Sequence, residues 1–256
     1  MGQLAGKRCL IVGGTSGIGL ATAEAFLREG ARLAVSGLAP PPAGVEARLH
    51  GKGLVGLWSC QAADPGQIEE LFAKAIAALG GLDALVHVAG GSGRKRGDGP
   101  LHRCSDEGWD YTLRINLTSV FLSNRAAVRH MRGHGGGAIV NLASVLAFAP
   151  APPWFDTVAY AAAKGGVISL SRLAAARYAH EAIRVNVIAP GLTDTPMAQR
   201  ALDDPALAAF VRHRQPLAQG PCPAEAVAQA AVYLCSDAAA CITGTVLTVD
   251  AGWCVA

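Results

Sequence analysis

Short apolar runs alternate with longer amphipathic segments along the whole chain. Runs rich in branched residues predict seven strands, at 9–12, 32–36, 54–59, 84–88, 138–143, 184–188 and 246–249. Apolar residues at helical spacing predict helices between them, over about 20–28, 45–50, 65–76, 106–131, 158–179 and 224–234. Strands that alternate with helices indicate a parallel sheet covered on both faces. We therefore expect one α/β domain over residues 1–256, doubly wound around a mostly parallel seven-stranded sheet.

Composition agrees with a single large domain. A chain of 256 residues with 51% hydrophobic content can bury about 70 to 75% of its unfolded surface in one core. Charged residues make up 16% and the mean hydropathy is +0.31, which is an apolar balance for a soluble domain and suggests that an oligomer hides further surface. The net charge of +3 is spread along the chain, so nucleic-acid binding is not indicated.

The remaining composition points to a cytoplasmic protein. Seven cysteines, odd in number and without a C-x-x-C pair, predict reduced thiols rather than disulfides or a zinc site. The apolar run after Lys7 and Arg8 is too short for a signal peptide. The longest uncharged run, 138–155, contains two polar residues and three prolines, so no membrane span is expected.

A glycine-rich turn follows the first predicted strand and opens the first predicted helix. Its sequence is Gly13-Gly14-Thr15-Ser16-Gly17-Ile18-Gly19. In that context Gly13 permits a tight turn, Gly17 lets the backbone approach a pyrophosphate, and Gly19 allows close packing of helix on strand. The turn therefore predicts a dinucleotide site. The second strand ends in Gly37 with no acid to select NAD, and Gly37 leaves room for a 2′-phosphate, so we lean towards NADP.

Tyr160 and Lys164 lie four residues apart and would share one face of a helix. Lowering the pKa of a phenol from ~10 to ~7 requires roughly 3 units, or ~4 kcal/mol, and one neighbouring ammonium supplies about 1 to 3 units. A second positive charge, such as an oxidised nicotinamide ring, would complete the shift. The alternative interpretation is a packed ring beside a solvated amine.

Taken in order, the motifs resemble those of the short-chain dehydrogenases/reductases of the single-domain branch, which have the Rossmann fold. The resemblance covers nearly the whole chain. Besides the glycine turn, it includes Ala89-Gly90, Asn116, Ser144, Tyr160-x-x-x-Lys164, Pro190-Gly191-x-x-x-Thr195 and Val249-Asp250-x-Gly252. It implies an NAD(P)-dependent oxidoreductase that moves a hydride to or from a carbonyl or secondary alcohol, assembled as a homotetramer.

The resemblance also implies roles for individual residues. Tyr160 would be the general acid or base, Lys164 would lower its pKa, and Ser144 would hold the substrate oxygen. Asn116 would free a backbone carbonyl to hold a proton-relaying water, and 192–219, which looks mobile, would close over substrate. The expected cofactor-binding residues are Gly13, Thr15, Ser16, Gly17, Ile18, Gly19, Gly37, Gln61, Ala62, Ala89, Gly90, Tyr160, Lys164, Pro190, Gly191, Thr193 and Thr195. The expected substrate pocket comprises Ser92, Arg94, Ser144, Trp154 and Tyr160, with no metal.

Departures from the family pattern identify the open points. His87-Val88 replaces the usual Asn pair, which puts a brace between neighbouring strands in doubt, and Gln61 stands where an Asp usually meets the adenine. An insertion containing Trp154 and Phe155 is expected to line the substrate pocket. The Arg94-Lys95-Arg96 run is either solvated loop charge or a site that attracts an acidic or phosphate-bearing substrate.

Two other interpretations remain. The first is a catalytically silent cofactor-binding sensor or structural protein of the same fold, against which the intact Tyr160 and Lys164 argue. The second is an epimerase or dehydratase of the longer branch, which the glycine spacing and the lack of a C-terminal substrate domain disfavour. Within the enzyme interpretation, reduction of a 3-oxoacyl thioester is one option.

Overall fold

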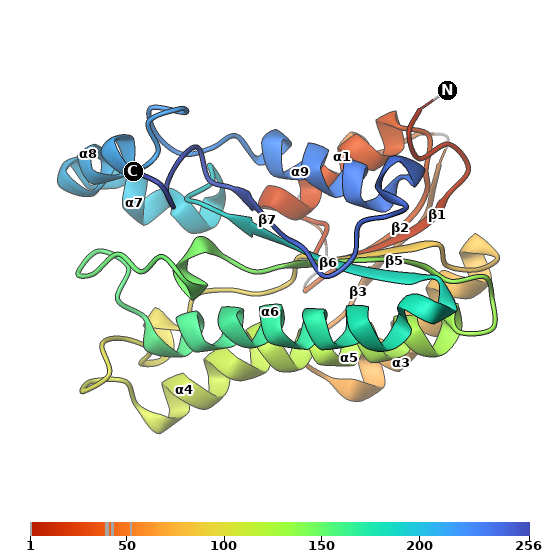
Figure 1. Cartoon of the computed structure of the whole chain (residues 1–256), viewed down its shortest axis with the longest axis horizontal. Helices are drawn as coiled ribbons and strands as arrows, with labels where there is room; N and C mark the ends of the chain where they lie inside the picture. The colour runs from red at the N-terminus through yellow and green to blue at the C-terminus, as the bar shows by residue number, and fades with distance from the viewer. Residues whose placement is uncertain (1, 39–40, 42–43, 52) are drawn as a thin grey trace.

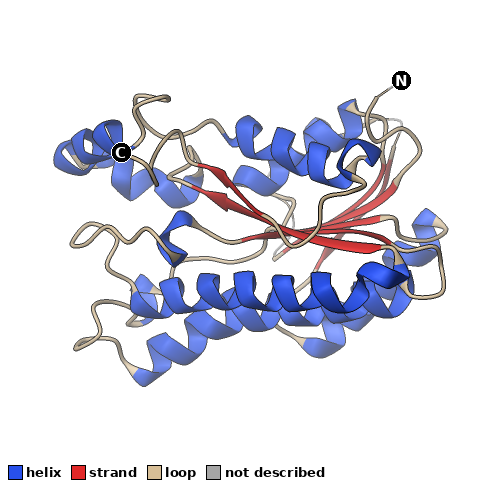
Figure 2. Ribbon diagram, in the orientation of Figure 1, coloured by secondary structure: helices blue, strands red, loops and turns tan. Residues whose placement is uncertain are grey.

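The computed structural model of the chain describes residues 2–38, 41, 44–51 and 53–256. Its strands form one sheet in the order β3-β2-β1-β4-β5-β6-β7, and each of these pairs is parallel (Figures 1 and 2). The doubly wound seven-stranded sheet predicted from sequence is confirmed. The strands are β1 Arg8–Val12, β2 Arg32–Gly37, β3 Leu54–Ser59, β4 Ala84–His87, β5 Gly137–Leu142, β6 Ile183–Pro190 and β7 Val246–Val249.

Helices cover both faces of the sheet. In Figure 1, α1 and α9 lie on one face, and α3, α5 and α6 lie on the other. Successive side chains of β1 point to opposite faces of the sheet. Cys9 and Ile11 pack in the cluster with α1 and α9. Leu10 and Val12 pack in the cluster with α3 and α5. The helices are α1 Gly17–Arg28, α2 Val45–Leu49, α3 Pro65–Leu79, α4 Asp106–Leu113, α5 Ser119–Met131, α6 Val158–Tyr178, α7 Gln199–Asp203, α8 Pro205–Arg214 and α9 Ala224–Cys235.

Two parts of the chain differ from the sequence prediction. The helix expected over 106–131 contains a π-helical turn, Arg114–Thr118, between α4 and α5. The segment 192–219, expected to look mobile, contains α7 and α8. The Asp204 carboxylate caps α8 by accepting from the amides of Ala206 and Leu207, and Leu207 is fully buried against the cluster that includes Trp253.

The strand order places the topological switch point of the sheet between the central strands β1 and β4. The chain order reverses there, and in such sheets a crevice forms outside the carboxyl ends of the two strands. The glycine turn follows β1, and the segment that begins Ala89-Gly90 follows β4. No helix in the described ranges is long and apolar enough to cross a bilayer.

Candidate functional site

A cavity of about 570 Å³ lies at the carboxyl ends of β1 and β4. It brings together residues that are far apart in sequence, from the glycine turn at its start to Thr195 near α7. All expected site residues except two line it. Gly19 and Trp154 do not. Those that do are Gly13, Thr15, Ser16, Gly17, Ile18, Gly37, Gln61, Ala62, Ala89, Gly90, Ser92, Arg94, Asn116, Ser144, Tyr160, Lys164, Pro190, Gly191, Thr193 and Thr195.

The glycine turn has the geometry that a dinucleotide requires. Gly13 adopts a φ of +88°, and a Cβ there would lie 2.5 Å from the amide nitrogen of Ala89. A Cβ on Gly19 would lie 1.9 Å from the carbonyl oxygen of Gly13, so Gly19 is needed for packing rather than for lining the cavity. Ser16, the N-cap of α1, makes no side-chain capping bond, which leaves the amides of this helix end available to an anion. These residues fit the pyrophosphate of NAD or NADP.

The end of β2 differs from what the sequence suggested. A Cβ on Gly37 would lie 2.2 Å from Oγ1 of Thr15, so the Thr15 side chain already fills the space that Gly37 leaves. The described residues that line this end of the cavity, Leu38 and 60–63, include no Lys or Arg. The glycine is thus explained by Thr15 and is no evidence of space for a 2′-phosphate, so only the absence of an acid at Gly37 remains in favour of NADP.

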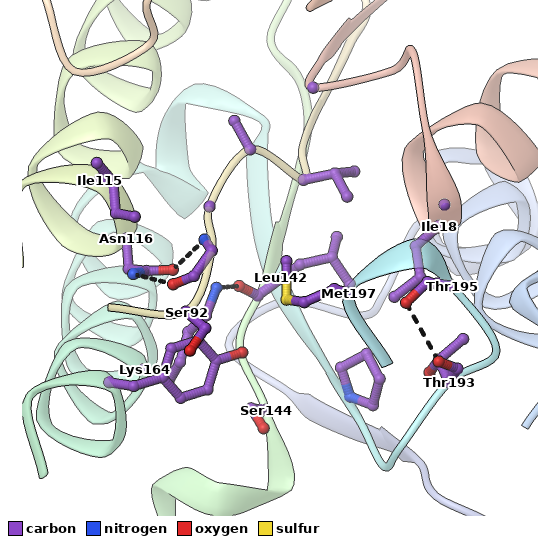
Figure 3. Close-up of a pocket in the computed structure, with 18 of the residues that line it drawn as sticks. Ile18, Ser92, Ile115, Asn116, Leu142, Ser144, Lys164, Thr193, Thr195 and Met197 are labelled. Atoms are coloured by element: carbon purple, nitrogen blue, oxygen red, sulfur yellow. Dashed lines mark hydrogen bonds between the residues drawn. The ribbon is translucent and has the colours of Figure 1, made fainter. Parts of the chain in front are cut away.

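The first turns of α6 bring Tyr160 and Lys164 to the cavity. Lys164 is buried and donates from Nζ to the carbonyl oxygen of Leu142 at 2.8 Å (Figure 3). The same Nζ lies 5.6 Å from the centre of the Tyr160 ring. Burial lowers the pKa of Lys164 to about 8. Burial raises the pKa of Tyr160 to about 12, and a hydrogen bond with Ser144 lowers it only in part. The expected lowering by Lys164 is not found in the chain alone.

Asn116 lies in the π-helical turn and holds the loop after β4. Its Oδ1 accepts from the amide of Gly91 at 3.0 Å, and its Nδ2 donates to the carbonyl oxygens of Gly91 and Thr112, each at 2.9 Å (Figure 3). A Cβ on Gly90 would lie 2.6 Å from Asn116 Oδ1 and 3.6 Å from Lys164 Nζ. The side chain thus fixes this loop next to the Lys164 ammonium.

Asp98 is a residue of the site that the sequence interpretation missed. Its carboxylate accepts from the amides of Ala159 and Tyr160, each at 3.0 Å, and so caps α6 from a different segment of the chain. The N-cap residue itself, Thr157, makes no side-chain capping bond. The one sequence signal was a lone acid in a basic loop. Asp98 positions the backbone that carries the Tyr160 phenol.

His87 replaces the brace that was in doubt. Its Nδ1 lies 2.7 Å from Ser123 Oγ, and its Nε2 lies 3.1 Å from the Ala89 carbonyl oxygen and 3.3 Å from Ser119 Oγ. The ring therefore joins the end of β4 to α5 rather than to a neighbouring strand. Burial, together with the charge of Lys164, lowers the pKa of His87 to about 3, so the imidazole is neutral.

The insertion before α6 contributes Phe155, not Trp154, to the cavity. The Trp154 ring packs against Phe210 of α8, with 6.1 Å between centroids, while Phe155 meets Trp253 edge to face at 5.6 Å. The Trp154 carbonyl oxygen accepts from both Arg94 and Arg200. Arg200 lines the cavity and was also missed by the sequence interpretation. Of the run 94–96, only Arg94 lines the cavity.

Known proteins that resemble this chain agree with the residues found at the cavity. The family profile described as enoyl-(acyl carrier protein) reductase matches residues 12–254. The cis-4-hydroxycyclohexanecarboxylate dehydrogenase of Sinomonas cyclohexanicum is 38% identical over 255 residues, covering 99% of each chain. A 2,5-dichloro-2,5-cyclohexadiene-1,4-diol dehydrogenase of Sphingobium indicum is 36% identical over 255 residues, again with 99% coverage of each. A solved short-chain type dehydrogenase/reductase from Mycobacterium ulcerans superposes with a TM-score of 0.90 at 30% identity, covering 98% of this chain and 91% of that one. Since both the profile and the full-length relatives agree with the residues of the site, this chain belongs to the short-chain dehydrogenase/reductase family.

Proposed function

We propose that the protein moves a hydride between NAD(P) and a carbonyl or secondary alcohol, with Tyr160 as its general acid and base. Membership of a family of NAD(P)-dependent oxidoreductases supports an NAD(P)-dependent oxidation or reduction. The observation that carries the proposed mechanism is the convergence of Tyr160, Ser144 and Lys164 on the cavity that also holds the glycine turn. The nicotinamide would supply or accept the hydride and, when oxidised, would add a positive charge to the site.

The protonation state of Tyr160 suits the reductive direction. With a pKa of about 12 the phenol keeps its proton at neutral pH, which is the form that protonates a carbonyl oxygen. Ser144 interacts with this phenol and would hold the same substrate oxygen. For alcohol oxidation the pKa must fall by about 5 units to reach neutrality, or about 7 kcal/mol, which is more than Lys164 supplies alone. The chain therefore needs a bound cation to favour the phenolate.

Replacing Tyr160 with Phe tests the mechanism. General acid catalysis typically contributes about 100- to 10,000-fold, so we expect a loss of that size in kcat. Substrates are chosen from the relative named above: 4-oxocyclohexanecarboxylate for reduction and cis-4-hydroxycyclohexanecarboxylate for oxidation. Cofactor binding, followed by fluorescence, is expected to remain. Tyr178→Phe is the matched control, because Tyr178 ends the same helix but does not line the cavity. Unchanged turnover in Tyr160→Phe would refute the mechanism.

We also propose a modest preference for NADP(H), supported now only by the absence of an acid at the end of β2. Competitive titrations of the two cofactors decide it, and NAD(H) bound at least tenfold tighter, about 1.4 kcal/mol, would reverse the preference.

A homotetramer is the third part of the proposal. Phe121 on α5 is 44% exposed and Leu173 on α6 is 73% exposed, and the small residues of these helices would let another subunit approach closely. Light scattering that shows a monomer would exclude this assembly.

Reduction of a 3-oxoacyl thioester stays an option for the substrate. The description of the matching family profile favours an acyl-carrier substrate, whereas the names of the two relatives favour a six-membered ring. Assaying acetoacetyl-CoA beside 4-oxocyclohexanecarboxylate separates the two classes.

A further inference from the structure

Two arginines from distant parts of the chain meet beside the catalytic residues. Arg94 lies in a short turn after β4, and Arg200 lies in α7. Both line the cavity that Ser144 and Tyr160 also line. Each donates from Nη2 to the carbonyl oxygen of Trp154, at 3.1 Å and 3.3 Å respectively. Two guanidiniums that share one acceptor must lie close together.

The charge of this pair is not neutralised within the protein. In the part of the chain that the structure describes, no carboxylate lies within 4.0 Å of either guanidinium. Burial and Arg200 lower the pKa of Arg94, while Asp98 and Asp156 raise it. The Asp98 oxygens already accept from the amides that begin α6. A half-buried cation beside another cation is unfavourable until an anion joins it.

The half-buried Arg94 and the exposed Arg200 also have donors that no described protein acceptor takes. A guanidinium carries about five N–H groups, and each of these side chains has one hydrogen bond to a described protein acceptor. Guanidiniums bind carboxylates and phosphates through paired hydrogen bonds, which explains why an anion suits this position better than a neutral group. The neighbouring Lys95 and Arg96 are exposed and do not line the cavity, and Arg96 lies 3.8 Å from Glu107.

We propose that Arg94 and Arg200 bind an anionic group of the substrate, so that the enzyme acts on a compact hydroxy or keto acid. The carboxylate would lie at the arginines while the carbonyl or hydroxyl lies at Tyr160. This rests on the proposed function. Phosphates of an acyl-thioester carrier have the same chemistry, but the half-buried position of Arg94 in a cavity of about 570 Å³ that must also take the nicotinamide favours a small acid.

The first test compares 4-oxocyclohexanecarboxylate with its methyl ester. We expect the wild type to prefer the acid. We expect Arg94→Gln and Arg200→Gln to lower kcat/KM for the acid by about 10- to 100-fold, the range for losing one hydrogen bond to a charged group, and to affect the ester less. Lys95→Gln and Arg212→Gln remove exposed positive charges outside the cavity and serve as controls. Equal losses on acid and ester would mean that the arginines only hold the Trp154 carbonyl, and would overturn the inference.

The second test needs no turnover. Calorimetric titration of cyclohexanecarboxylate and cyclohexanecarboxamide, with and without cofactor, measures recognition of the anion alone. We expect the carboxylate to bind about tenfold or more tightly than the amide in the wild type, and this advantage to be lost in Arg94→Gln. Carboxylate binding without hydride transfer would sink the proposed function and leave the anion site at Arg94 and Arg200 standing. Hydride transfer with no preference for the carboxylate would do the reverse.

The third arm uses acetoacetyl-CoA. If the arginine variants impair its reduction but leave the compact acid unaffected, the bound anion is the carrier's phosphate. That outcome would overturn the assignment of a small acid. Impairment confined to the compact acid would support it.

Discussion

His87 gives the protein a dependence of stability on pH that can be worked out from the structure. The imidazole is buried, its pKa is lowered to about 3, and its ring nitrogens lie within hydrogen-bonding distance of Ser123, Ala89 and Ser119. In the unfolded chain a histidine has a pKa near ~6.5. Between these two values the unfolded state takes up a proton that the folded state does not. The contribution of His87 to stability is therefore full above about pH 6.5 and is lost as the pH falls towards about 3.

The perturbation is His87→Asn, which restores the residue that the family usually has there. The variant loses the ring contacts, so it is less stable than the wild type at neutral pH. As the pH falls, protonation of His87 in the unfolded state destabilises the folded wild type, whereas the variant has no such group. Between about pH 7.5 and pH 5, proton uptake by His87 in the unfolded state should lower the free energy of unfolding of the wild type by about 2 kcal/mol relative to the variant. The stability gap between the two proteins should shrink by this amount.

Urea unfolding followed by tryptophan fluorescence, at fixed protein concentration, measures the gap at each pH. Taking the difference between wild type and variant cancels the titration of all groups that the substitution leaves alone. His102→Asn, which removes an exposed histidine, is the matched control. A gap for His87→Asn that stays constant between neutral and acidic pH would show that the folded protein protonates His87 normally, and would refute the reasoning.

Two further substitutions test the supports of the site. Asp98→Asn removes the charge that caps α6 and should lower the free energy of unfolding by about 1 kcal/mol. We expect kcat to fall while cofactor affinity is unchanged, with Asp110→Asn at an exposed position as control. A fall in cofactor affinity without a fall in kcat would contradict the positioning role. Gly19→Ala places a methyl group 1.9 Å from the Gly13 carbonyl oxygen and should abolish cofactor binding in a titration. Gly66→Ala, whose Cβ meets only an Asp64 oxygen at 3.4 Å, should bind the cofactor normally and is the control. Normal binding by Gly19→Ala would count against the close packing of this turn.

Local sequence patterns were sufficient for all seven strands and for most of the helices. The apolar runs at 54–59 and 246–249 coincide with β3 and β7, although these are the edge strands of the sheet and are only partly buried, so a short run of strand-forming residues was signal enough. The start of the helix predicted at 65 is confirmed, because Asp64 caps α3 through the nearby amide of Gln67 and Pro65 suits its first turn. The same Asp-Pro pair at Asp204-Pro205 begins α8, a local signal that lies within the segment 192–219 expected to be mobile.

Features set by distant contacts could not be predicted. The π-helical turn at Arg114–Thr118 accompanies bonds between Asn116 and Gly91, which are 25 positions apart, so helical periodicity carries no trace of it. Asp98 caps a helix whose amides are 61 and 62 positions away. Likewise, that Phe155 lines the cavity while Trp154 turns to Phe210 depends on α8 and on Trp253.

The loop after β4 carries Arg94, which lines the cavity, and Asp98, which holds the helix of Tyr160. Its backbone is tied together, because the amides of Arg96, Gly97 and Asp98 all donate hydrogen bonds within it, and Gly93 approaches Thr112 too closely for any side chain. With Arg94 in its proposed role, recognition and positioning are encoded in one short peptide, yet at separate positions. A change at position 94 would then leave the carboxylate that caps α6 in place, and this loop would offer an evolving or engineered enzyme a way to exchange substrates while keeping its chemistry.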